Sequence, residues 1–103
     1  MITRIRHGVP QRSKADDYLR LLRARAIPAY QAVPGNQAAL VLRRDEGDKT
    51  HFLTLSLWSS LDAIRGLAGD DVERAVYFPE DAEYLLEFEP TVAHYHAYAT
   101  ATD

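Results

Sequence analysis

The chain contains no cysteine, and this absence excludes several classes of site. Without a thiol it can form no disulfide, thiolate zinc site, iron–sulfur cluster or cysteine nucleophile. It also lacks long apolar runs: AALVL and FLTLSLW have the length of strands, far below the roughly 20 residues that a membrane helix needs. The first residues, MITRIRHGV, place arginine inside an apolar segment, unlike a secretory signal. We therefore expect a cytoplasmic protein with no membrane partner.

The remaining composition is that of an ordinary globular domain. The chain has 103 residues, of which 47% are hydrophobic and 26% charged. These values exclude a disordered chain, a collagen or a coiled coil. With no repeat, linker or low-complexity tract, residues 1–103 are expected to form one domain.

The charge is divided unequally along the chain. Residues 1–51 hold ten of the twelve lysines and arginines, whereas residues 52–103 hold ten of the fifteen acidic residues. A nucleic-acid binder would gather its basic residues on one face with aromatic side chains between them. Here the arginines are spread along one expected helix and two expected strands. We therefore favour ion pairs between the two halves of the chain and expect no nucleic-acid partner.

Alternation of apolar and polar residues with a period of two predicts four strands. They cover residues 2–9, 37–44, 50–58 and 91–99. On the first strand, one face carries Ile5 and His7 and the other carries Arg4 and Arg6.

Capping signals and apolar stripes predict the helices. The main helix is expected from Ser13, where Ser13 and Asp16 resemble a capping box, to Pro28, which ends or kinks it before a short continuation. Three shorter helical segments are expected further on: Ser59 to Gly66 or Gly69, Asp70 to Pro79, and an acidic turn over 80–87.

This β-α-β-β-α-β order predicts an α+β, ferredoxin-like fold with a four-stranded antiparallel sheet. Helices would cover one face of that sheet and leave the other bare. A bare apolar face in so small a protein is usually buried against another surface, and a second copy is the simplest candidate. We therefore expect a homodimer.

With this element order, several segments resemble the antibiotic biosynthesis monooxygenase family of the dimeric α+β barrel superfamily. They are RIRHGV, VPGN, LTLSLWSSLDAIRGLAGDDVERAVYFPED and VAHYHAY, so the resemblance covers nearly the whole chain. It implies a dimeric α+β barrel. The family is functionally mixed and includes cofactor-free oxygenases of phenolic polyketides and haem-degrading enzymes, so fold transfers more safely than chemistry.

The haem-degrading branch can be compared residue by residue. Its axial histidine falls at Tyr77, its distorting tryptophan at Leu67, and its first-strand asparagine near Arg6 or His7. None of these positions is retained, although tyrosine can ligate haem iron in some proteins. We therefore expect no haem and no other cofactor.

Histidine titrates nearest neutral pH and is the first candidate for a catalytic base. His7 shares an apolar strand face with Ile5, and we expect the helices to cover that face. Burial there would favour neutral imidazole, which can accept a proton from a phenol; the alternative is a core histidine bonded to a hydroxyl. We expect His94 opposite His7 on the same face. With His96 these two could bind a metal, but no carboxylate is aimed at them, and we expect no metal site.

Aromatic side chains could line a flat pocket between helices and sheet, which suits a planar ligand. The proposed catalytic residues are His7 and Tyr77, and the proposed substrate-binding residues are Trp58, Tyr30, Phe78 and His94. Plain core packing is the alternative, favoured for Tyr18 and Trp58. We expect a cofactor-independent monooxygenase that acts on a small phenol- or anthrone-like molecule with dioxygen. A non-catalytic barrel that binds a small apolar ligand and, less favoured, a haem-degrading monooxygenase are the alternatives.

Overall fold

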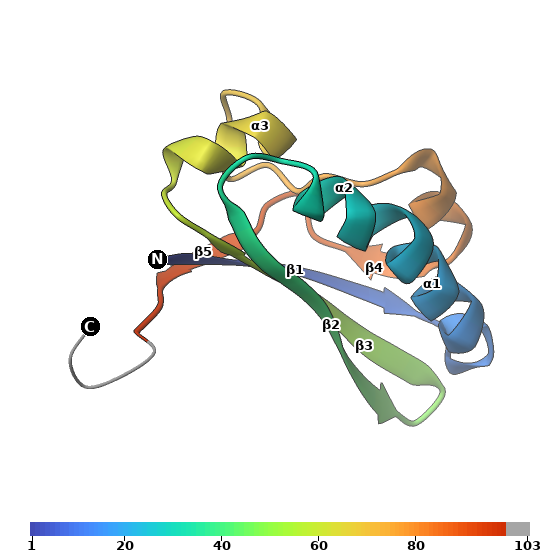
Figure 1. The fold of residues 1–103 in the computed structure, drawn as a ribbon. Coiled ribbons are helices and arrows are strands. Elements are labelled where there is room, and N and C mark those ends of the chain that lie inside the picture. Colours follow the sequence, from blue (N-terminus) through green and yellow to red (C-terminus); the bar gives the residue numbers. More distant parts are fainter. Residues whose placement is uncertain (99–103) are drawn as a thin grey trace.

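The computed structural model describes residues 1–98, and its centre is an antiparallel sheet (Figure 1). The five described strands are β1 (Ile2–Pro10), β2 (Asn36–Glu46), β3 (Lys49–Trp58), β4 (Leu85–Phe88) and β5 (Ala93–His96). Their order is β2-β3-β1-β4, and β5 also pairs with β1. The α+β, ferredoxin-like class is confirmed.

Two short strands, β4 and β5, lie beside β1 where one last strand was expected. β5 pairs with the first half of β1, from Ile2 to Ile5, and β4 pairs with its end, from Gly8 to Pro10. The expected strand over 91–99 is therefore shorter, and its residue 99 lies outside the described residues. The acidic helical turn expected over 80–87 is a 3₁₀ turn, Pro79–Glu83, followed directly by β4.

The main helix is continuous from residue 15 to residue 31. It consists of α1 (Ala15–Leu21), a π-helical turn (Leu22–Ala26) and α2 (Ile27–Gln31). The π turn directly precedes Pro28, the residue expected to disturb the helix, and α2 continues beyond it as predicted. The Ser13–Asp16 capping box does not form, because Asp16 pairs with Arg43 instead.

The helix expected from Asp70 to Pro79 is absent. The preceding helix, α3 (Arg65–Ala68), ends at Gly69, and the chain then runs without helix to residue 78. Main-chain carbonyls in this segment accept hydrogen bonds from arginines of β1 rather than from helical N–H groups. Capping signals at Asp70 and Glu73 were outweighed by these tertiary bonds.

All helices lie on one side of the sheet (Figure 1). They cover the side that carries Arg4 and Arg6, together with Phe52 near the start of β3 and Trp58 at its end. The expectation that they cover the Ile5 and His7 face was wrong. None of the described helices is long and apolar enough to cross a membrane.

The uncovered side, called the open face below, is rich in leucine. Its residues alternate with buried ones along β3 and with half-buried ones around Leu40 and Leu42 of β2, and these two leucines are each 43% exposed. The open face consists of Ile5, His7, Leu40, Leu42, Arg44, His51, Leu53, Leu55 and Leu57.

Candidate functional site

Two arginines of β1 are buried beneath the helices. Arg4 is 2% exposed and Arg6 is 3% exposed. Arg4 donates hydrogen bonds to the carbonyl oxygens of Val72 and Arg74, the latter at 2.6 Å, and Arg6 donates to the carbonyl of Val76 at 2.7 Å. Because buried charges are costly unless their hydrogen bonds are satisfied, these bonds hold the 72–76 segment against β1.

A buried polar cluster surrounds Arg6. Its Nη2 donates to the Tyr18 hydroxyl at 2.9 Å and lies 3.6 Å from the Asp81 carboxylate. Tyr18 in turn donates to Asp81 at 2.7 Å, and burial is the main cause that raises the pKa of Tyr18. The Nε of Arg6 has no hydrogen-bond partner among the described residues. One donor of a buried cation is therefore unused.

Tyr30 lies close enough to Arg4 and Arg6 for their charges to affect its hydroxyl. It is 3% exposed, and burial raises its pKa, whereas the charges of Arg6 and Arg4 lower it. The helix-side interior thus contains two cations and one carboxylate, Asp81. This excess of positive charge would stabilise an oxygen anion.

A hollow of about 240 Å³ lies beside this cluster. Its lining residues are Tyr77, Phe78, Pro79, Asp81, Ala82, Leu85 and Phe88. The guanidinium carbon of Arg6 lies 4.6 Å from the Tyr77 ring centroid, so Arg6 stands directly behind the wall of the hollow. The Tyr77 hydroxyl donates to the Glu89 carbonyl at 2.6 Å, and burial raises its pKa.

The other predicted substrate-binding residues are dispersed. Trp58 is fully buried against Ile64 and Ala68, and its indole N–H donates to Ser56 at 2.8 Å. Tyr30 belongs to the core around the main helix. His94 pairs with Arg4 along the sheet, and burial, followed by the charge of Arg4, lowers its pKa. Only Phe78 lies with Tyr77 in the hollow.

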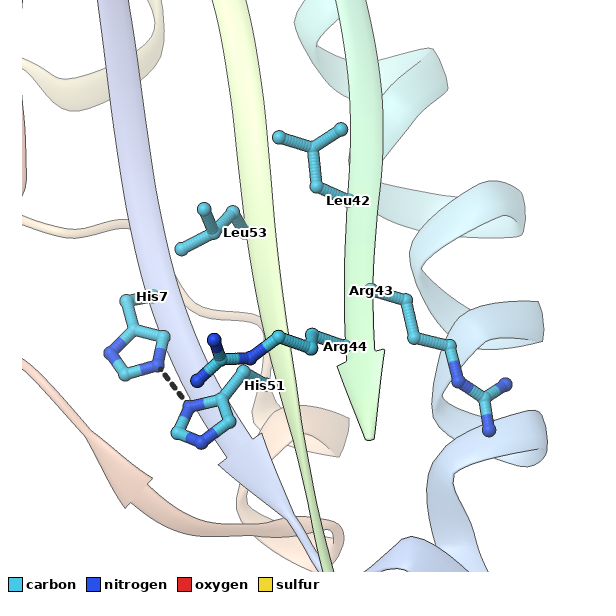
Figure 2. Close-up of a pocket in the computed structure, with 6 residues that line it drawn as sticks. All are labelled: His7, Leu42, Arg43, Arg44, His51 and Leu53. Atoms are coloured by element: carbon cyan, nitrogen blue, oxygen red, sulfur yellow. Dashed lines mark hydrogen bonds between the residues drawn. The ribbon is translucent and has the colours of Figure 1, made fainter. Parts of the chain in front are cut away.

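His7 lies on the open face and not opposite His94. Its partner is His51 of the neighbouring strand β3, in the diagonal position two residues before Leu53, which lies directly opposite His7. His7 Nε2 is 3.0 Å from His51 Nδ1, and the rings are stacked with centroids 5.3 Å apart (Figure 2). A hollow of about 330 Å³ surrounds the pair. Its lining residues are His7, Leu42, Arg43, Arg44, His51 and Leu53.

The three histidines considered as a possible metal site are not brought together. His94 pairs with Arg4 and His96 with Ile2, on the side opposite to His7. Within residues 1–98, no three His, Asp or Glu side chains are grouped as metal ligands.

Sequence reasoning missed Arg6 and Asp81 and did not single out His51. For Arg6 the sequence did contain a signal: Arg4 and Arg6 are two positions apart on a central strand, so both must point to the same side of the sheet. Asp81 belongs to the acidic turn expected over 80–87, where no pattern in the sequence indicated burial, yet it is 2% exposed. The expected ion pairs between the halves of the chain are present, as Arg6 with Asp81 and Arg25 with Glu80 show.

This architecture defines a small α+β protein with helices on one face of a ferredoxin-like sheet, and known structures share it. A crystal structure of an antibiotic biosynthesis monooxygenase matches with a TM-score of 0.66 and 21% identity, covering 96% of this chain and 100% of that chain. Rv0793 from Mycobacterium tuberculosis matches with a TM-score of 0.58 and 18% identity, covering 97% of each chain. A variant of MhuD with two manganese protoporphyrin IX molecules per active site matches with a TM-score of 0.58 and 16% identity, covering 98% of each chain.

The family model of antibiotic biosynthesis monooxygenases matches residues 1–71. The chain therefore belongs to the antibiotic biosynthesis monooxygenase family, as the sequence resemblance indicated. Among curated proteins, none matches it.

The helix-side residues do not fit a histidine-ligated haem. Within residues 1–98, no imidazole lines the hollow at Tyr77, and the Tyr77 hydroxyl, which stands at the expected ligand position, donates its hydrogen bond to the Glu89 carbonyl. The porphyrin seen in the MhuD variant is therefore not carried over to this chain.

Proposed function

We propose that this chain is a monooxygenase that oxidises a small, electron-rich aromatic molecule with dioxygen and needs no cofactor. One observation carries the proposal: the buried guanidinium of Arg6, with a free Nε, stands behind a hollow lined by Tyr77, Phe78 and Phe88. Aromatic walls suit a planar substrate, and a preorganised buried cation stabilises the anion that forms when the substrate loses a proton.

The reaction balances without an external reductant. An anthrone, for example, carries a CH₂ group opposite its carbonyl. Loss of one proton gives an anion that passes an electron to dioxygen, and recombination of the radical pair forms a peroxide. Loss of water from the peroxide leaves a quinone, so one oxygen atom enters the product and the other leaves as water. The protein's contribution is to position the anion and stabilise its charge.

The proposal assigns the proton to Asp81, because this residue lines the hollow and its carboxylate lies 3.6 Å from Arg6. His7 is the alternative acceptor that the sequence suggested, but it lies on the other side of β1. A base must reach its proton directly or through one water, which favours Asp81.

The experiment measures oxygen uptake by purified protein with an anthrone, without added metal, flavin or haem. We expect His7→Gln to retain the wild-type rate, Tyr77→Phe to lose about tenfold, and Asp81→Asn to lose about 10²–10⁴-fold, the range typical of a lost general base. Circular dichroism melting must show that each variant folds. The reverse pattern, with loss only in His7→Gln, would move the base to the open face. No uptake with any phenol or anthrone would favour the ligand-binding alternative.

We further infer that two copies associate through the open face. Leucines of β2 and β3 are exposed there, and no described helix covers them. Apolar patches of this kind usually mark an interface, and a two-fold pair is the commonest closed arrangement. This assembly corresponds to the dimeric α+β barrel that the family resemblance implies.

A further inference from the structure

We propose that the His7–His51 pair makes the association of two copies through the open face sensitive to pH, an inference that rests on the assembly proposed above. The pair belongs to β1 and β3 and lies beside Leu42 and Leu53 (Figure 2). It is thus a titratable pair at the charged end of the leucine patch, with Arg44 of β2 beside it. When that patch is covered, the charged form of the histidine pair loses water and becomes less favourable.

The two imidazoles form the middle of a four-residue chain. His7 Nδ1 lies 3.4 Å from a Glu89 carboxylate oxygen, and His51 Nε2 lies 3.2 Å from a Glu46 oxygen. Between the rings, His7 Nε2 and His51 Nδ1 are 3.0 Å apart. A hydrogen bond at this position needs one N–H donor and one nitrogen without a proton.

The pair can therefore carry one positive charge and keep its central hydrogen bond. A second proton would place two N–H groups against each other at the 3.0 Å contact and two cations in one stack. The rings must then separate or turn. Full protonation thus opposes the arrangement of the two rings seen in the structure.

Other charged groups around the pair come from every neighbouring element. Arg44 of β2 lines the same hollow and disfavours added positive charge, whereas Arg43 points away toward the helices (Figure 2). The charged or titratable groups on this side are His7 of β1, Arg44 and Glu46 of β2, Lys49 and His51 of β3, Glu87 of β4 and Glu89 after it. The carboxylates are at the rim, with Glu46 and Glu89 side chains 64% and 63% exposed, so solvent weakens their compensation.

A second copy that covers the open face would remove solvent from the pair. A dication held in a covered interface is costly, so the assembled form binds fewer protons than two separate copies. By linkage, association is then strongest above the range where histidines titrate and weakens as the pH falls through it. With two pairs in each assembly, we expect the dissociation constant to rise about tenfold to a hundredfold between about pH 7.5 and about pH 5.5.

Sedimentation velocity of the full chain at these two pH values tests the proposal. The variant His51→Gln replaces the titrating ring with a neutral amide, and we expect it to remove most of the pH dependence. His96→Gln is the matched control, because it removes a histidine on the other side of the same sheet and should leave the wild-type dependence. Circular dichroism at both pH values checks that the monomers stay folded.

The outcomes are separable from those of the oxidation experiment. Equal dissociation constants at both pH values, or a pH dependence unchanged in His51→Gln, would overturn the proposal. A wild-type protein that is monomeric at both pH values would overturn the assembly and this inference together, and it would leave the proposed oxidation standing. Ring-nitrogen NMR supplies a second measure: we expect His7 and His51 to take up their second proton over the pH range in which the copies separate.

Discussion

Arg6 connects three parts of the molecule through one side chain. It donates to the Val76 carbonyl and to Tyr18, and it lies beside Asp81. Each of these groups comes from a different segment: the stretch after α3, the main helix and the 3₁₀ turn before β4. A buried charge adds little net stability when it is paired, but losing one partner leaves the other charged and buried.

This asymmetry predicts how Arg6 variants unfold. Arg6→Met should lower the free energy of unfolding by about 3–5 kcal/mol, because the Asp81 carboxylate is left without its cation. The double variant Arg6→Met with Asp81→Leu should recover most of that loss. Urea denaturation measures both.

Arg20→Ala is the comparison, since Arg20 pairs with Asp17 in solvent and its side chain is 73% exposed. Its loss should cost about 0–1 kcal/mol. Equal effects of Arg6→Met and Arg20→Ala would contradict a structural role for the buried pair.

At the scale of elements, α3 packs closely against Val33, just after the main helix, because Gly66 has no side chain at the point of contact. A Cβ added at Gly66 would lie 2.6 Å from a methyl carbon of Val33, far inside normal contact. Alanine favours a helix over glycine by about 1 kcal/mol, but overpacking costs about 1–3 kcal/mol, so packing decides the sign.

Gly66→Ala should therefore lower the thermal midpoint although it raises helix propensity. Combining it with Val33→Ala should restore part of the loss, because the clashing methyl group is removed. A differential scanning calorimetry cycle of the four proteins measures the coupling. If the effects of Gly66→Ala and Val33→Ala simply add, the two positions are not coupled, and α3 accommodates the added methyl group without cost.

At the scale of the whole molecule, the two faces of the sheet differ in composition. The helix side holds the buried arginines and the aromatic hollow, and the open face holds leucines and the histidine pair. The proposed oxidation uses the helix side, and the proposed assembly uses the open face. Changes on the open face should therefore alter assembly and leave the fold intact.

Leu42→Lys should convert the assembled protein to monomers at neutral pH. Leu42 is 43% exposed, so its replacement costs a single copy little, but a lysine inside a covered apolar face would be desolvated. Leu61→Lys is matched to it, with Leu61 45% exposed and outside the sheet, and should leave the oligomeric state unchanged. Light scattering at several concentrations reports both. An assembled Leu42→Lys protein would place the interface elsewhere.

The local pattern of the chain was sufficient for its first three strands and its main helix. Alternation predicted β1, β2 and β3. An apolar stripe on the main helix predicted its buried side, with Leu19 only half-buried and the other members buried: Ala15, Tyr18, Leu19, Leu22 and Ala26. These features depend on neighbours within a few residues, since side-chain periods of two and 3.6 follow directly from backbone geometry. Family membership followed from the same motifs.

The candidate site could not be derived in this way. Both sides of β3 carry apolar residues, so the sequence pattern does not say which side of the sheet the helices cover. The side is decided by long-range hydrogen bonds between the 72–76 segment and the arginines of β1, such as the bond from Arg6 to the Val76 carbonyl. The same contacts replaced the helix expected at 70–79. The sequence alone thus determined the ferredoxin-like class and the residues available for chemistry. Only the tertiary structure decided that Arg6, Tyr77 and Asp81 meet while His7 pairs with His51, because those contacts join residues far apart in the chain.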